Sequence, residues 1–342
     1  MIASLSTAWL FGAFALAGLV ILVIGTRITD LADRIADRSG LGEAVIGGIV
    51  LGAATSLSGV VVSITSALEG APQLAFANGV GGIAAQTAFL ALADVIHKRA
   101  NLEHSAAEAT NLFQGALLLS LLCLPLIAFT TPEITVFAVH PISVLLIAVY
   151  CVGAVTTSRV REQPMWRPVR TAETVEDEPD EPPSRAGMLA LAGSFAVLVA
   201  ILGAAGWVIA QTGSALSERL GMSQTVVGAL MTAVVTSLPE LVTTIAAVRR
   251  GAMQLAMGGI IGGNTFDTLF LSLSDMAYRD GSLYHAVGPA EYFWLVVGLL
   301  MTAVLLIGLI LREREGPLKI GTESVAMLAI YAGAVGLQVV AG

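Results

Sequence analysis

Long apolar runs separated by short polar breaks dominate this chain. Ten of the runs approach or exceed the roughly 20 residues that a helix needs to cross the hydrocarbon core of a membrane. They cover residues 7–24, 43–68, 72–96, 112–129, 135–154, 187–210, 224–248, 252–274, 292–311 and 323–340. The runs are continuous and do not alternate polar with apolar positions, which excludes a transmembrane barrel. The pattern predicts an all-α membrane protein with ten transmembrane helices.

The polar breaks recur at a fixed spacing, because the chain matches itself at an offset of 181 residues. Residues 70–90 align without a gap on residues 251–271, with ten of the 21 positions identical. The same offset places residues 55–57 on residues 236–238, which are Thr-Ser-Leu in both copies. Corresponding interruptions in two halves of a membrane protein indicate a transporter whose substrate site lies where the repeats meet.

Composition agrees with a membrane protein. Hydrophobic residues make up 56% of the 342 residues and charged residues 12%, and the mean hydropathy is +0.84. A soluble core could not enclose that much apolar surface. The net charge of -8 gives no reason to expect a nucleic-acid partner. The lipid bilayer is the first partner that the composition predicts.

Lys and Arg residues lie almost entirely in alternate loops. Fifteen fall in one set of loops and only two, Arg219 and Arg279, on the side that holds both termini. By the positive-inside rule both termini face outward and the central loop is cytoplasmic. We therefore expect a multi-pass protein of the cell inner (plasma) membrane. With five helices in each half, the second half enters the membrane from the opposite side, so two inverted five-helix repeats are predicted.

The repeats define three parts of the chain. Residues 1–157 are the first five-helix repeat and residues 187–342 are the second. Residues 158–186 form an acidic, Pro-rich linker on the cytoplasmic side, whose composition cannot bury enough apolar surface to fold alone.

Two acidic residues lie in the middle of apolar runs, where an ionisable group is costly and usually serves function. Glu240 follows Thr236, Ser237 and a proline that interrupts the helical hydrogen bonds. Asp267 ends a Gly-Gly-Asn-Thr-Phe-Asp stretch in which Asn264 supplies an amide oxygen. Carboxylate, hydroxyl, amide and carbonyl oxygens are ligands for a hard cation. A buried, protonated glutamate that only holds helices together is the structural alternative.

The stretch from residue 227 to Asp267 resembles the second alpha-repeat of the sodium/calcium exchanger family, in the cation/calcium antiporter superfamily. The residues that carry the resemblance are Thr-Ser-Leu-Pro-Glu at 236–240 and Gly-Gly-Asn-Thr-Phe-Asp at 262–267. The resemblance implies ten helices as five plus five, alternating access, and exchange of calcium against sodium at mid-membrane. It also implies that Glu240 and Asp267 are acidic ligands and that Thr236 and Ser237 bind through backbone and hydroxyl oxygens.

The first repeat departs from the family pattern. At the positions that correspond to Glu240 and Asp267 it has Gly59 and Gln86. The remaining neutral candidates for cation binding in this half include Thr55, Ser56 and Gln86, with Ser58, Ser63 and Asn78 beside them. Two carboxylates supply a charge of about -2, enough for one divalent or up to two monovalent cations. Because burial favours a protonated carboxyl, a proton could compete with the cation at Glu240.

The sequence therefore predicts a secondary active cation antiporter and no enzyme, with inorganic cations as its substrates and no cofactor. Calcium is the substrate that the resemblance implies, and sodium or protons are the counter-ion. Two alternatives stay open. The first is a proton-coupled, monovalent or magnesium transporter with an asymmetric site, and the second is a non-transporting membrane protein of the same fold.

Overall fold

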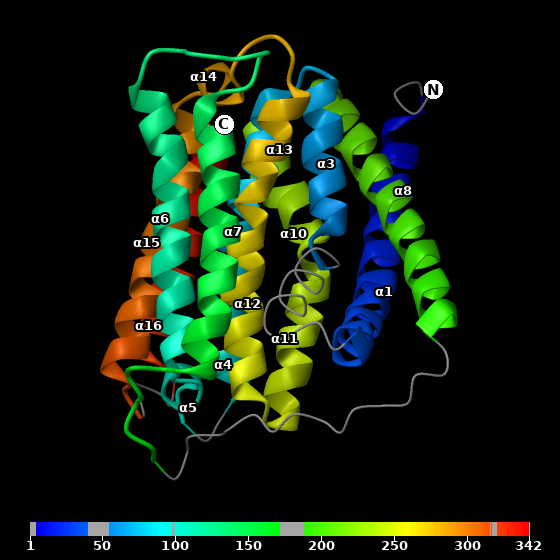
Figure 1. Ribbon diagram of the computed structural model, residues 1–342. Helices are drawn as coiled ribbons and strands as arrows, with labels where there is room; N and C mark the ends of the chain where they lie inside the picture. Colours follow the sequence, from blue (N-terminus) through cyan, green and yellow to red (C-terminus); the bar gives the residue numbers. More distant parts are fainter. Residues whose placement is uncertain are drawn as a thin grey trace.

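The computed structural model describes residues 5–39, 55–97, 100–171, 188–314, 316 and 320–341. Within these ranges the protein is a bundle of helices that stand side by side, and its only β-pairing is a bridge between Val136 and Val139 (Figure 1). The described helices of the first half are α1 (Thr7–Ser39), α3 (Leu57–Leu68), α4 (Pro72–Ile96), α5 (Leu102–Ser105), α6 (Ala109–Thr130) and α7 (Pro141–Glu162).

The second half begins with the long helix α8 (Met188–Leu220) and is more interrupted. It continues with α9 (Gln224–Val226), a π-helical segment η3 (Val227–Thr232), α10 (Ala233–Thr236), α11 (Leu238–Arg250), α12 (Met253–Asp267), α13 (Leu269–Ala277), α14 (Leu283–Ala286), α15 (Pro289–Leu311) and α16 (Thr322–Ala341).

Seven of the described helices are long and apolar enough to cross a membrane, and a bent pair of helices makes an eighth span if counted as one. The predicted run 72–96 coincides with α4. Of the predicted run 43–68, α3 lies in the described part of the chain and residues 43–54 lie outside it. The structure thus supports a nearly all-helical membrane protein, and the count of ten spans stays a prediction.

The predicted run 135–154 is wrong at its start, because α7 begins only at Pro141. The preceding residues turn back on themselves, with Phe137 and Ala138 in the left-handed region of backbone conformation. The His140 side chain accepts the backbone N–H of Ile142, and proline is well suited to the first turn of a helix. A helix cap therefore overrides the apolar composition at this end of the run.

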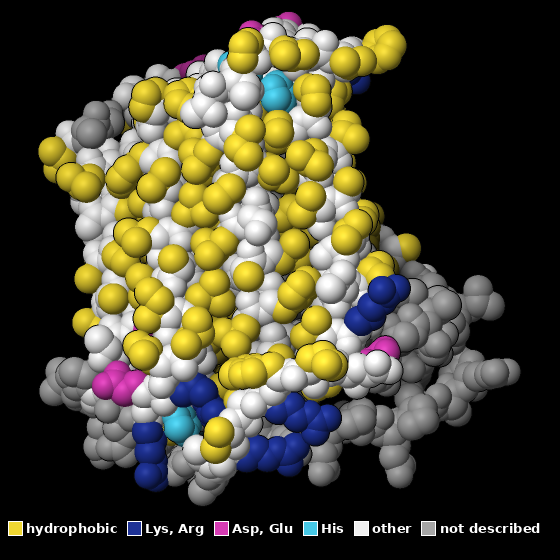
Figure 2. Space-filling model, turned by 60° about the vertical axis from the view of Figure 1, so that its left-hand side comes forward, with side chains coloured by type: hydrophobic (Ala, Val, Ile, Leu, Met, Phe, Trp, Pro, Cys, Tyr) yellow, Lys and Arg dark blue, Asp and Glu magenta, His cyan; other side chains and the backbone are white. Residues whose placement is uncertain are grey.

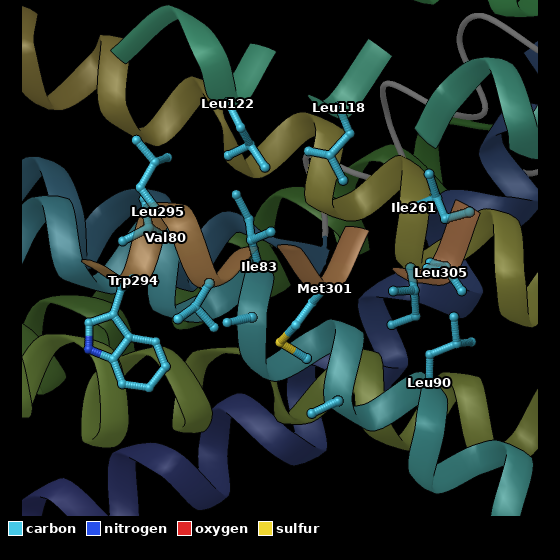
Figure 3. Close-up of a cluster of buried hydrophobic side chains, with 14 of the residues drawn as sticks. Val80, Ile83, Leu90, Leu118, Leu122, Ile261, Trp294, Leu295, Met301 and Leu305 are labelled. Atoms are coloured by element: carbon cyan, nitrogen blue, oxygen red, sulfur yellow. The ribbon is translucent and has the colours of Figure 1, made fainter. Parts of the chain in front are cut away.

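Helix α4 lies at the centre of the bundle, and 83% of its apolar window is buried. Side chains from α6, α12 and α15 pack against it in a hydrophobic cluster that includes Ile83, Leu122, Ile261, Trp294 and Met301 (Figure 3). A helix enclosed on all sides needs no amphipathic stripe. This explains how α4 can carry several polar groups in the interior of the protein.

Helix α4 approaches the π-helical segment η3 unusually closely. A Cβ atom on Gly81 would lie 2.5 Å from Cα of Ala229, and one on Gly228 would lie 2.8 Å from Cβ of Ala77. Glycine allows two backbones to touch in this way, as in other membrane helix pairs. The two halves of the chain are thus joined directly at the middle of the bundle.

Helices α1 and α8 pack along each other at one side of the bundle (Figure 1) and form a second hydrophobic cluster. Helix α1 also touches the second half closely, because a Cβ on Gly25 would lie 2.4 Å from Cγ of Pro239. The exposed side chains of α1 include Trp9, of whose surface 72% is accessible.

The molecular surface is banded. On the face drawn in Figure 2, apolar side chains cover the middle of the bundle, and most of the Arg side chains lie toward the end of the molecule drawn at the bottom. That end carries α5, whereas α14, the start of α1 and the end of α16 lie at the opposite end (Figure 1). An apolar belt between polar ends is what a membrane-spanning protein presents to lipid.

Candidate cation-binding site

Two helix breaks lie beside the central helix α4. The first is at Ser237, where the α9–α10 span meets α11 at an angle of 45°. Pro239 has no N–H and so cannot continue the hydrogen-bond ladder across this point. The second is at Thr268, which separates α12 from α13. Each break places an acidic residue at a helix end, Glu240 in the first turn of α11 and Asp267 in the last turn of α12.

Glu240 is buried, with 4% of its surface exposed. Neither of its carboxylate oxygens has a hydrogen-bond partner among the described residues, although the Thr55 side chain lies beside the carboxylate. The Asp267 carboxylate is close enough for the two negative charges to repel each other. A buried carboxylate with so few donors is costly, and a proton or a cation at this position would lower that cost.

Asp267 is also buried and is contacted from the first half of the chain. Its Oδ2 accepts a hydrogen bond of 2.6 Å from the Gln86 side-chain amide on α4. The same Gln86 nitrogen donates to Oγ of Ser237 at 3.3 Å. The Ser56 side chain lies beside Asp267, and Oδ1 of Asp267 has no partner among the described residues. Gln86 therefore links both helix breaks of the second half to α4.

These contacts are related by the 181-residue offset. Ser56 corresponds to Ser237 and Gln86 to Asp267, so the approach of Ser56 to Asp267 mirrors the approach of Ser237 to Gln86. Two glycines complete the relation. A Cβ on Gly82 would lie 3.6 Å from Oγ of Ser237, and one on Gly263 would lie 3.4 Å from Oε1 of Gln86. Glycine at both positions keeps the polar groups close together.

Two of the predicted site residues, Thr236 and Asn264, form hydrogen bonds with groups outside the candidate site. The Thr236 hydroxyl donates to the carbonyl of Ala233 in its own helix, while the Thr236 carbonyl accepts from Ser58 at 3.5 Å. Asn264 donates from its amide to the Thr87 hydroxyl of α4, which leaves its Oδ1 without a partner. The Thr236 carbonyl oxygen thus accepts one hydrogen bond already, whereas the Asn264 amide oxygen accepts none from the described residues.

Five of the predicted site residues together carry six buried oxygens that have no hydrogen-bond partner among the described residues. These oxygens are Oγ of Ser56, Oε1 of Gln86, both carboxylate oxygens of Glu240, Oδ1 of Asn264 and Oδ1 of Asp267. Nearly all buried polar atoms in proteins have partners, so such a concentration requires an explanation. Oxygen ligands of mixed charge are what a hard cation binds.

Other polar residues that the sequence suggested as candidates serve to join helices. The Asn78 amide donates to the carbonyl of Gly59 and to the Ser63 hydroxyl, and its oxygen accepts from the Thr232 hydroxyl. The Ser63 hydroxyl itself donates to the carbonyl of Ala75. This network ties α3 and α4 to η3, and its groups are satisfied without an ion.

The place where the first half lacks a carboxylate is filled by an aromatic ring. A Cβ on Gly59 would lie 2.6 Å from Cε2 of Phe270. Phe270 belongs to α13 and packs edge-on against Phe266 in a small apolar cluster. Sequence comparison of the two halves identifies the missing acid, but the residue that occupies its space lies far away in the chain.

Asp94 and Asp275, also 181 residues apart, are both buried. Asp94 accepts the backbone N–H groups of Leu102 and Gly321. Asp275 accepts those of the corresponding residues, Leu283 and His140. We call these arrangements the α5 clasp and the α14 clasp. Each ties a short helix to the bundle at one end of the molecule.

Comparisons with known proteins show which family the chain is similar to. The sequence profile of the family described as "Sodium/calcium exchanger protein" matches residues 9–158 and 189–340. The chain is 26% identical over 263 residues to the putative antiporter CaxA of Alkalimonas amylolytica, which covers 75% of this chain and 77% of that protein. It is 46% identical over 63 residues to the sodium/calcium exchanger MaX1 of Methanosarcina acetivorans, a match that spans 18% of each protein.

Solved structures show the same fold. The sodium-calcium exchanger NCX_Mj superposes with a TM-score of 0.61 at 19% identity, over 97% of this chain and 99% of that one. The H+/Ca2+ exchanger CAX superposes with a TM-score of 0.66 at 12% identity, over 97% of this chain and 86% of that one. Since the family profile covers both halves of the sequence, this chain belongs to the sodium/calcium exchanger protein family.

Proposed function

We propose that this protein is a secondary active cation antiporter that binds its ion beside α4, between the helix breaks at Ser237 and Thr268. Glu240 and Asp267 supply the negative charge. Thr55, Ser56, Gln86 and Asn264 supply neutral oxygens, and Thr236 and Ser237 supply backbone and hydroxyl oxygens. The ion would reach this site alternately from the two sides of the membrane, through inverted five-helix repeats joined by the linker at residues 158–186.

One observation carries this proposal. Six buried oxygens that have no hydrogen-bond partner among the described residues belong to residues that the sequence predicts as cation ligands. Two of them are the oxygens of an acid that faces another acid. A purely structural role would be expected to satisfy these groups with hydrogen bonds, as happens for the neighbouring Asn78. A bound cation would satisfy both the charge and the lone pairs.

We propose calcium as the transported ion, with sodium or protons as the counter-ion. Structures of the relative NCX_Mj were obtained with sodium and calcium or strontium, and the relative CAX is an H+/Ca2+ exchanger. Calcium binds six to eight oxygens in flexible geometry and favours carboxylates. Glu240 and Asp267 could together balance its charge.

A proton-coupled or magnesium-selective transporter is the second candidate. It is favoured by the Phe270 ring at Gly59 and by Gln86 opposite Asp267, because these leave the candidate site without an acid from the first half. A site of two carboxylates accommodates several sodium ions less readily than a site of three or four. A proton at Glu240 would discharge that carboxylate when the cation leaves.

The role of Glu240 is tested by reconstituting the protein in liposomes and measuring calcium flux. We expect Glu240→Gln to abolish exchange, because the substitution removes one of the two negative charges and keeps the side-chain shape. Glu291→Gln is the matched control. Glu291 is a buried acid, but it caps α15 by accepting the backbone N–H of Gly288, so this variant should retain flux. Wild-type flux in Glu240→Gln would exclude Glu240 as a ligand.

The choice of ion is tested with the same liposomes. Gradients of calcium, magnesium, sodium, potassium or protons are imposed one at a time, and the ions that drive calcium efflux are identified. If protons are the counter-ion, exchange with a pH gradient persists when sodium is absent. If sodium is the counter-ion, a pH gradient alone drives no efflux.

A further inference from the structure

The α5 clasp and the α14 clasp share their backbone hydrogen bonds but differ in charge. At the position where α14 has Tyr284, α5 has Glu103, which lies 181 residues earlier. The Tyr284 hydroxyl forms a hydrogen bond of 2.9 Å with the Ser143 hydroxyl, so this part of the α14 clasp is neutral. Glu103 is fully buried, and neither of its carboxylate oxygens has a hydrogen-bond partner among the described residues. The α5 clasp therefore holds an acid where its counterpart holds a phenol.

A second acid enters the α5 clasp from α16. Glu323 lies in the first turn of that helix, is 7% exposed, and contacts the Glu103 carboxyl group. Its stem packs against α15, where a Cβ on Gly308 would lie 2.6 Å from Cγ of Glu323. A Cβ on Gly321 would lie 3.0 Å from Oε1 of Glu323 and 3.2 Å from Oδ2 of Asp94. Three carboxyl groups thus converge beside Gly321.

The surrounding charged groups are mostly occupied by other partners. Arg312, at the end of α15, donates to the carbonyls of Val169 and His104. The His104 ring contacts the carbonyl of Arg312 and the Thr171 hydroxyl. Glu313 accepts from the Thr322 hydroxyl and adds negative charge near Glu323. Of the three carboxyl groups, that of Asp94 accepts the backbone N–H groups of Leu102 and Gly321.

Two touching carboxyl groups in a buried place cannot both be ionised without a large cost, and a shared proton removes it. Burial raises the pKa of Glu103 well above its usual range, and the charges of Asp94 and Glu323 raise it further. In the described part of the chain no group of three or more His, Cys, Asp or Glu side chains has an arrangement that could hold a metal ion. Two carboxyl groups in contact are an arrangement that can share one proton.

We propose that Glu103 and Glu323 form a proton-binding site, separate from the cation site, that keeps the α5 clasp closed while one proton is shared between them. The proton comes from water at this end of the molecule, which the slightly exposed Glu323 reaches first. When the proton leaves, two or three buried negative charges repel each other. The start of α16 and helix α5 are then expected to separate, and the hydrogen bonds of Leu102 and Gly321 to Asp94 open more often.

The sign of the pH dependence follows from the tighter binding of the proton in the closed form. The closed clasp is most stable at low pH and loses stability as the pH rises through the raised pKa of Glu103. Because one proton is involved, the opening equilibrium changes by at most about tenfold per pH unit.

The test is hydrogen–deuterium exchange of the full-length protein in detergent between pH 6 and pH 9, corrected for the intrinsic pH dependence of amide exchange. In the wild type, peptides that contain Leu102 or Gly321 should lose protection as the pH rises. Peptides that contain Leu283 or His140, from the α14 clasp, should keep it and serve as an internal control. In Glu103→Gln the amide donates permanently to Glu323, so protection at the α5 clasp should no longer depend on pH.

Two results would overturn the proposal. One is equal pH dependence at both clasps of the wild type, a comparison that needs no variant to fold. The other is restoration of protection at pH 9 by millimolar calcium or magnesium, which would identify a metal site instead. Neither measurement depends on ion transport, so failure here leaves the proposed antiport untouched.

Discussion

At the residue scale, the contact between Gly59 and Phe270 governs how the asymmetric site could be made symmetric. The ring lies where any side chain at position 59 would begin. Phe270 is held by Phe266 and neighbouring apolar residues, so it cannot move without disturbing that cluster. A first-half carboxylate therefore requires both a new acid and a smaller neighbour.

We expect Gly59→Ala and Gly59→Glu each to lower the free energy of unfolding by about 1–3 kcal/mol through overpacking. Phe270→Ala alone should also destabilise, by about 3–5 kcal/mol, because it leaves a cavity. In the double variants the two costs should partly cancel, with a coupling of about 0.5–3 kcal/mol in thermal unfolding measurements in detergent. Strictly additive losses would mean that the ring swings aside and does not restrict position 59.

Much of the candidate site could be predicted from single residues. Glu240 and Asp267 stand out as acids in apolar runs, and the 181-residue offset identifies Gln86 and Ser56 as their neighbours. The roles of Asp94 and Asp275 could not be predicted, because one of the two backbone N–H groups that each accepts belongs to a residue remote in the sequence, Gly321 or His140. The contact of Phe270 with Gly59 could not be predicted either, because an aromatic residue in an apolar helix carries no polar signal.

At the scale of elements, the crossing of α4 with the π-helical segment η3 fixes the position of the site. Gly81 and Gly228 bring the two backbones together one to two turns from Gln86 and Thr236. Extra residues in a π-helical turn shift the face that a helix presents and are frequent at functional sites. The apolar pattern predicts the span 224–248 as a whole but contains no signal for its π-helical turn.

Gly81→Ala should push these helices apart, because the added methyl group would meet the backbone of Ala229 at 2.5 Å. We expect a loss of about 1–3 kcal/mol in stability and a fall in calcium flux, since Gln86 on the same helix would shift. Gly259→Ala is the matched control, because no atom lies within 4 Å of its Cβ position. The explanation is wrong if both variants unfold at the same temperature.

At the scale of the whole molecule, two features predict how the protein is oriented in the membrane. They are the apolar band on its surface and the uneven distribution of Lys and Arg along the sequence. On the face drawn in Figure 2, most of the Arg side chains lie toward the α5 end, which agrees with the loop counts from the sequence. Hydropathy and charge together could therefore predict the overall arrangement. They could not predict where α7 begins, because that depends on the His140 cap.

We expect the start of α1 to face outward and the end of α7 to face the cytoplasm. Single cysteines at the exposed positions Ser6 and Gln163, in a background with Cys123 and Cys151 replaced by alanine, test this. A membrane-impermeant maleimide applied to intact cells should label Ser6→Cys at once and Gln163→Cys only after permeabilisation. The reverse pattern of labelling would invert the proposed orientation.

The α5 clasp and the α14 clasp can be compared with each other within this one chain. Repeated segments diverge independently, so the hydrogen bonds to Asp94 and Asp275 that both copies retain mark contacts that neither half has lost. Position 103 and its counterpart 284 mark a place where divergence was tolerated or favoured. In an ancestor with matching halves, both ends of the molecule would have responded alike to their surroundings. In the present chain the two ends of the molecule share the hydrogen bonds to Asp94 and Asp275 but differ in having Glu103 at one end and Tyr284 at the other.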